Sequence, residues 1–75
     1  MLKTTLSKQE LIVFSLLIRE YKGNEIAKKL NLDEKTIGTY KTRIQIKLGL
    51  KTIIGMYVYN VKHKISLTDE QLELN

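Results

Sequence analysis

The residues whose types and spacing could serve a function surround one short turn in the middle of the chain. The small residue Ala27 is followed four positions later by Asn31, and the apolar Ile37 comes six positions after that. A small side chain lets two helices cross closely, asparagine tolerates the positive φ of a tight turn, and an apolar anchor holds the second helix inward. This spacing predicts a helix-turn-helix, whose second helix can enter the major groove of double-stranded DNA.

The second helix of this unit, predicted from about Glu34 to Leu48, has an outer half that suits contact with DNA. Its inner face is apolar, and no acid occurs between Lys35 and Leu50. A helix face that is merely solvated usually intersperses Asp and Glu with its cations, so their absence favours a surface that meets phosphates. The candidate DNA-binding residues are Lys35, Thr36, Gly38, Thr39, Tyr40, Lys41, Thr42, Arg43 and Lys47.

The charge of the chain is distributed unevenly. All 13 Lys and Arg residues lie at or before Lys64, and with five acids in the same stretch this body carries +8, against +5 for the whole chain. A basic body suits a polyanion, because each phosphate that it neutralises releases condensed counterions. An ordinary soluble surface is the alternative explanation, so the charge supports DNA binding without establishing it.

Other classes of function lack the residues that they need. The chain has no cysteine, a single histidine (His63) and no glycine-rich phosphate loop, so we predict no enzyme activity, no cofactor and no metal site. It has no signal peptide, and no apolar run approaches the ~18 residues of a membrane helix. We therefore expect a cytoplasmic protein with no membrane partner.

The helical elements follow from apolar periodicity and from capping residues. Proline is absent and apolar residues recur at helical spacing, so the chain is predicted to be all-α with four helices. The first helix begins after a capping box formed by Ser7 and Glu10. The second, around residues 25–30, ends at Asn31, and Gly49 ends the third because glycine enters the left-handed cap without steric cost. Side-chain caps for the third and fourth helices are predicted at Asp33 and Thr52.

The length allows one domain with a modest core. We assign residues 1–65 to the helix-turn-helix domain and residues 66–75, which hold three of the acids, to an acidic C-terminal tail. Within the tail, Thr68-Asp69-Glu70-Gln71 repeats the capping-box pattern and predicts one extra turn. Neither a receiver nor a ligand-sensing domain is present, which fits a stand-alone regulator or the effector half of a longer protein. The start at Met1 favours the stand-alone case.

The stretch from Leu6 to Val61 resembles the LuxR/FixJ (GerE-type) helix-turn-helix domain. The resemblance implies a bacterial transcription regulator that binds specific DNA sequences, with residues 34–48 in the major groove and Tyr40 and Lys47 on the DNA backbone. It also implies that the fourth helix pairs two subunits into a homodimer. Its most specific part is Asp33-Glu34-Lys35-Thr36-Ile37-x-Thr39-Tyr40-Lys41-x-x-Ile44-x-x-Lys47-Leu48-Gly49.

The chain departs from the family pattern at several positions. Gly38 stands where the family often has a polar or charged base-reader, and the neighbouring Thr39 and Thr42 can contact the thymine methyl group, which favours A·T-leaning recognition. Gly55 replaces an acid at the start of the fourth helix. Ile12 replaces a charged residue and is either an extension of the core or a partner contact.

The fourth helix carries the predicted dimer interface. One apolar stripe at helical spacing is formed by Ile54, Tyr57, Val58 and Val61. The stripe either closes the core of the monomer or, if Ile53 and Met56 serve the core, leaves a face for a second copy. The main rival to a DNA reader is a protein-interaction module that pairs with another transcription regulator. A promoter-reading region of a sigma factor is a third reading, but it would not explain the apolar fourth helix.

Overall fold

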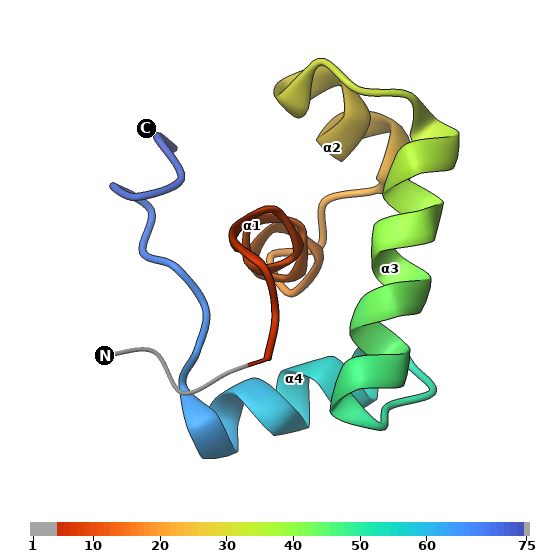
Figure 1. Ribbon diagram of the computed structural model, residues 1–75. Coiled ribbons are helices and arrows are strands. Elements are labelled where there is room, and N and C mark those ends of the chain that lie inside the picture. Colours follow the sequence, from red (N-terminus) through yellow and green to blue (C-terminus); the bar gives the residue numbers. More distant parts are fainter. Residues whose placement is uncertain (1–4, 75) are drawn as a thin grey trace.

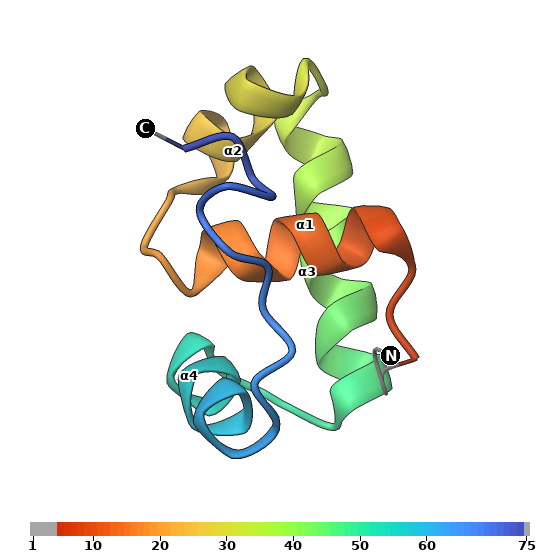
Figure 2. The same cartoon turned by 90° about the vertical axis from the view of Figure 1, so that its left-hand side faces the viewer.

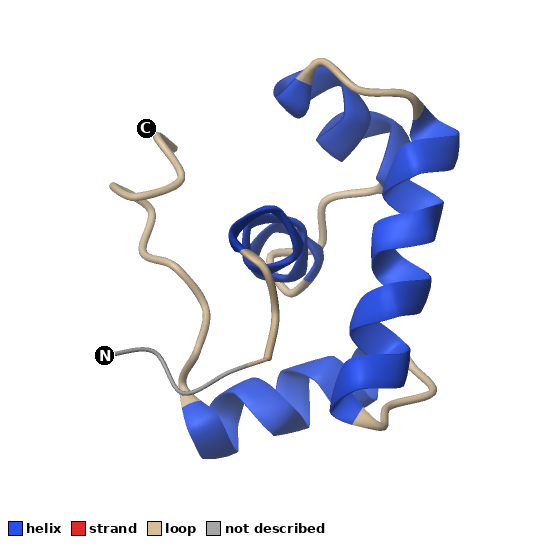
Figure 3. Ribbon diagram, in the orientation of Figure 1, coloured by secondary structure: helices blue, strands red, loops and turns tan. Residues whose placement is uncertain are grey.

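The computed structural model describes residues 5–74, and over this range the chain forms helices joined by short turns, without strands (Figure 3). The predicted all-α fold is confirmed. The helices are α1 (Lys8–Leu17), α2 (Gly23–Leu30), α3 (Glu34–Leu48) and α4 (Ile53–His63). None of them is long and apolar enough to cross a membrane.

Helix α1 lies at the centre of the molecule. Figure 1 looks along its axis and shows α2, α3, α4 and the C-terminal segment arranged around it. Val13, Phe14 and Leu16 are fully buried, although they point from different sides of the helix. A small chain without disulfides has little surface to bury, and here one apolar helix surrounded by the other elements provides most of the core. Helix α1 is therefore covered on more than one side.

Most of the predicted caps are present. Ser7 and Glu10 form the reciprocal capping box of α1, and Thr52 Oγ1 accepts the Gly55 N–H of α4 at 3.0 Å. Gly49 ends α3 in the left-handed conformation, with φ 68°. The predicted side-chain cap at Asp33 is wrong. This residue stands at the N-cap of α3, but its side chain accepts no capping hydrogen bond and stays exposed, where its charge can still act on the positive helix end.

The turn between α2 and α3 has the geometry that its residues predict. Asn31 adopts φ 57°, and the Leu32 N–H donates to the Ala27 carbonyl at 2.8 Å. Ala27 and Ile37 are buried where the two helices meet. Because Ala27 is small and Ile37 points inward, α3 is held firmly with its opposite face turned out.

The C-terminal segment folds back over α1. It leaves α4 at Lys64, and Figure 2 shows it crossing the face of α1 that is turned away from α3. Ile65 and Leu72 are buried in the core. The predicted extra turn is confirmed, since Thr68 and Gln71 exchange side-chain to backbone hydrogen bonds at 2.9 and 3.1 Å. The predicted tail is thus packed against the domain along its described residues.

Candidate nucleic-acid interface

The outer face of α3 is free of other elements. In Figure 1 the helix runs along one side of the molecule, with α1 and α2 on its inner side only. Ile37 and Ile44 anchor that inner side and are almost completely buried. Since both lie on one stripe, the residues on the opposite stripe point into solvent.

The candidate DNA-binding residues divide into two groups by exposure. The first group is exposed and available to a partner: Lys35, Gly38, Thr39, Thr42, Arg43 and Lys47. The second group is half-buried at the flanks of the helix: Thr36, Tyr40 and Lys41. The fold therefore brings all nine residues onto one helix, and their contact with DNA stays a prediction.

The outer face offers few free hydrogen-bond donors. The Thr39 hydroxyl donates to the Lys35 carbonyl of its own helix, in a long bond of 3.3 Å. Gly38 has no side chain, and a Cβ added there would meet nothing within 4 Å, so the position is open space. On this stripe the Lys35 ammonium and the Thr42 hydroxyl are side-chain donors without an assigned partner among the described residues.

Lys47 makes an ion pair that the sequence did not reveal. Its Nζ lies 2.8 Å from Oε1 of Glu10, which is buried and also accepts the Ser7 N–H. The hydrogen bond from Lys47, followed by the one from the Ser7 backbone, holds the pKa of Glu10 below its usual range. The pair ties the end of α3 to the start of α1 across 37 residues of sequence, which no local pattern signals. The Lys47 ammonium is still partly exposed. If it also bound a phosphate, the ammonium would be shared between that phosphate and the Glu10 carboxylate.

Helix α4 presents an apolar stripe to solvent. Met56 is fully buried and Ile53 packs against the core, so these two residues close the monomer. Ile54, Val58 and Val61 are exposed instead, which excludes the interpretation that they close the core. Tyr57, the fourth predicted dimer residue, is half-buried. Partial burial, with a smaller contribution from the charge of Glu20, raises the pKa of its hydroxyl.

Polar side chains of α1 hold the C-terminal segment. The buried Ser15 Oγ accepts the Leu67 N–H at 2.8 Å and donates to the Leu11 carbonyl at 2.8 Å. Arg19 donates to the Leu67 carbonyl and to Asp69, at 2.7 and 2.9 Å. Sequence reasoning missed these contacts because their partners lie about 50 residues apart.

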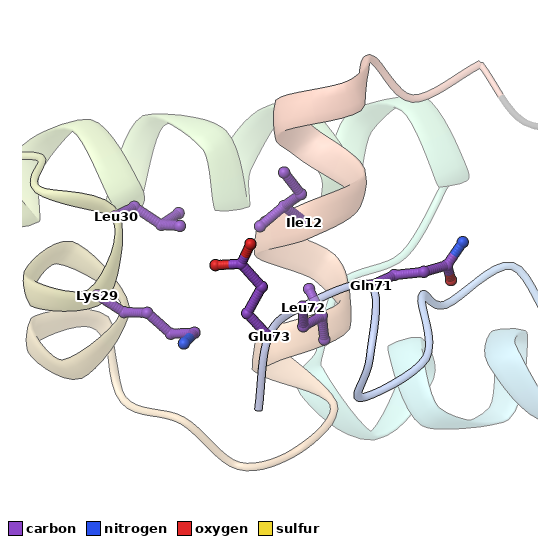
Figure 4. Close-up of a pocket in the computed structure, with 6 residues that line it drawn as sticks. All are labelled: Ile12, Lys29, Leu30, Gln71, Leu72 and Glu73. Carbon is purple, nitrogen blue, oxygen red and sulfur yellow. The ribbon is translucent and has the colours of Figure 1, made fainter. Parts of the chain in front are cut away.

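A shallow hollow lies between this segment and α2. Figure 4 shows its lining, in which Leu72 reaches toward Ile12 and Glu73 faces Lys29 and Leu30. Ile12 is half-buried here and packs against the core, which favours the interpretation of this residue as a core extension. The polar residues of its lining, Lys29, Gln71 and Glu73, are all exposed to solvent, so we assign the hollow no ligand.

Comparisons with known proteins agree with this architecture. EvgA of Escherichia coli K12, a DNA-binding transcriptional activator, is 36% identical over 61 residues, which are 81% of this chain and 30% of EvgA. The oxygen regulatory protein NreC of Staphylococcus aureus JH9 is 42% identical over 60 residues, which are 80% of this chain and 28% of NreC. The chain thus spans less than a third of these relatives. No solved structure matches it significantly.

The match to a family model covers the four helices almost completely. The model describes bacterial regulatory proteins of the luxR family and matches residues 4–60, which end within α4. The helix-turn-helix and the exposed outer face of α3 agree with this match, and the chain belongs to the LuxR family of bacterial regulatory proteins.

Proposed function

We propose that this domain binds specific sequences of double-stranded DNA and regulates transcription in the cytoplasm as a homodimer. Helix α3 lies in the major groove, and the stripe on α4 joins two copies at a two-fold site. The observation that carries the proposal is the outer face of α3, which is uncovered and has no acid after Glu34. The similarity of the chain to EvgA, a DNA-binding transcriptional activator, also supports the proposal.

The flanks of α3 supply the charge for the DNA backbone. Arg43 is exposed and has no ion-pair partner among the described residues, whereas Lys47 is held by Glu10. A free guanidinium can donate two hydrogen bonds to one phosphate. Arg43 therefore contributes more to phosphate binding than Lys47 does.

Titration of a labelled duplex at several salt concentrations tests DNA binding. The logarithm of the affinity falls with the logarithm of salt concentration, with a slope of about 0.9 per phosphate contact. Arg43→Ala lowers this slope by about 1. Lys62→Ala is the matched control, because Lys62 lies in the last turn of α4, and Figure 1 shows this end of α4 pointing away from α3. Equal slopes for the two variants would contradict the proposed placement of α3.

Dimerisation is tested separately by sedimentation. Val58 is well exposed, so Val58→Glu leaves the core intact while placing a charge in the proposed interface. We expect a monomer with unchanged far-UV circular dichroism, and weaker binding to a two-fold site. A dimer of unchanged affinity would exclude the α4 interface.

The exposed stripe on α4 also supports a second candidate function. A protein-interaction module would use Ile54, Val58 and Val61 to pair with a related transcription regulator and modulate it. In that case affinity for DNA is weak and nearly independent of salt, whereas the complex with the other regulator is tight. The same titrations therefore distinguish the two functions.

A further inference from the structure

The outer face of α3 carries one large apolar side chain that the core does not use. Ile46 is 75% exposed and lies one turn beyond Thr42 on the same stripe. Isolated exposed apolar residues are common, but this one stands on the face that the proposed function places in the major groove. At this position the Ile46 side chain would contact base edges in the major groove.

The neighbours of Ile46 make this stripe largely apolar over about two turns. Beyond Lys35 the stripe contains only Gly38, Thr39, Thr42 and Ile46. The Thr39 hydroxyl donates a hydrogen bond to the Lys35 carbonyl of α3. The methyl group of Thr39 is therefore the part of the side chain available to a partner. From residue 38 to residue 46 the helix rises about 12 Å, the length of roughly three to four base pairs. Charged side chains lie on the flanks, so the centre of the face offers methyl groups and little else.

The chemistry of the major groove contains one group that matches such a stripe. Base edges there present hydrogen-bond donors and acceptors, and the C5-methyl group of thymine is the apolar exception. An isoleucine set against donors or acceptors would desolvate them without replacing their hydrogen bonds. Set against a thymine methyl, it removes apolar surface from water on both sides.

We propose that Ile46, together with Thr42, determines specificity by packing against thymine methyl groups in the major groove. This inference rests on the proposed DNA binding and names the feature of the DNA that is read. Gly38 supports it, because the missing side chain lets the helix approach the bases closely at the preceding turns.

Replacement of thymine by deoxyuridine tests the inference, because this change removes only the methyl group. A binding sequence is first selected from a pool of random duplexes, and each thymine is then replaced singly. At one or two positions we expect binding about fourfold weaker per methyl group. Ile46→Ala removes this sensitivity at a position it contacts, so that thymine and deoxyuridine duplexes bind equally.

Ile54→Ala is the matched control. Ile54 is 73% exposed, almost as much as Ile46, but lies on α4. This variant keeps the sensitivity to the methyl group even where overall affinity falls with weaker dimerisation. The inference is overturned if no thymine is sensitive, if Ile46→Ala retains the sensitivity, or if Ile46→Ala changes only sedimentation. Absence of any DNA binding by the unmodified domain would overturn the proposed function as well.

Discussion

Removal of the Lys47 ammonium tests how far the Glu10 ion pair stabilises the fold. In Lys47→Met the side chain keeps its apolar stem, but the buried Glu10 carboxylate loses its only cationic partner among the described residues. Breaking a buried pair in this way usually costs about 3–5 kcal/mol. The side chain of Lys47 is 39% exposed, so solvent weakens the pair in the native protein and can reach the remaining carboxylate. We therefore expect a loss of about 2 kcal/mol at neutral pH.

The pH dependence of this loss has a definite sign. The pKa of Glu10 is lowered in the folded protein, so the pair stabilises the fold above the unfolded pKa of about 4.3 and loses this effect as the pH falls through the folded pKa. In Lys47→Met the largest cause of the lowered Glu10 pKa is gone, and only the Ser7 hydrogen bonds, opposed by burial, still lower it. The difference in stability between the native protein and the variant therefore narrows in acid.

Urea denaturation followed by far-UV circular dichroism, at about pH 7 and about pH 3.5, measures both effects. Lys62→Met is the control, because the exposed Lys62 makes no ion pair within the described residues. The reasoning is refuted if Lys47→Met destabilises no more than the control, or if its effect is as large in acid as at neutral pH.

Three further substitutions have expected effects on the free energy of unfolding, each measured by the same denaturation. Ser15→Ala leaves the Leu67 N–H without its acceptor and lowers stability by about 1–3 kcal/mol; no change would mean that this hydrogen bond does not stabilise the packing of the C-terminal segment. Thr52→Ala removes the acceptor for the Gly55 N–H and lowers stability by about 1 kcal/mol, and an unchanged midpoint would contradict the role of this cap. Gly38→Ala raises stability by about 1 kcal/mol, since the added methyl meets open space in a helix interior; destabilisation would show that the backbone there is not freely helical.

Local chemistry made the helices and their ends predictable. Asn31 and Gly49 adopt the left-handed conformation where their residue types require it, and the bounds of α3 agree with the predicted Glu34 to Leu48. Asp33 shows the limit of such reasoning. Its place at the N-cap follows from sequence, but whether its carboxylate turns to the backbone or to water depends on small differences in energy that no pattern records.

The candidate interface was only partly predictable. A helical wheel separates the outer from the inner residues of α3, because α3 packs on one side only. Which cations remain free depends on other elements, and Lys47 is held by a carboxylate that local sequence does not connect to it. The exposure of Ile46 and of the α4 stripe likewise depends on what the rest of the chain covers.

The sequence by itself determined the helix-turn-helix, most helix ends and the acid-free outer face of α3 after Glu34, because each depends on residues within one or two helical turns of each other. The tertiary structure alone decided what covers α1 on its far side. There Ser15 and Arg19 bind Leu67 and Asp69, and Leu72 enters the core. These contacts join residues about 50 positions apart, and their hydrogen bonds exist only when the C-terminal segment lies against α1. A segment whose acids suggested a separate tail is for that reason packed against α1 along its described residues.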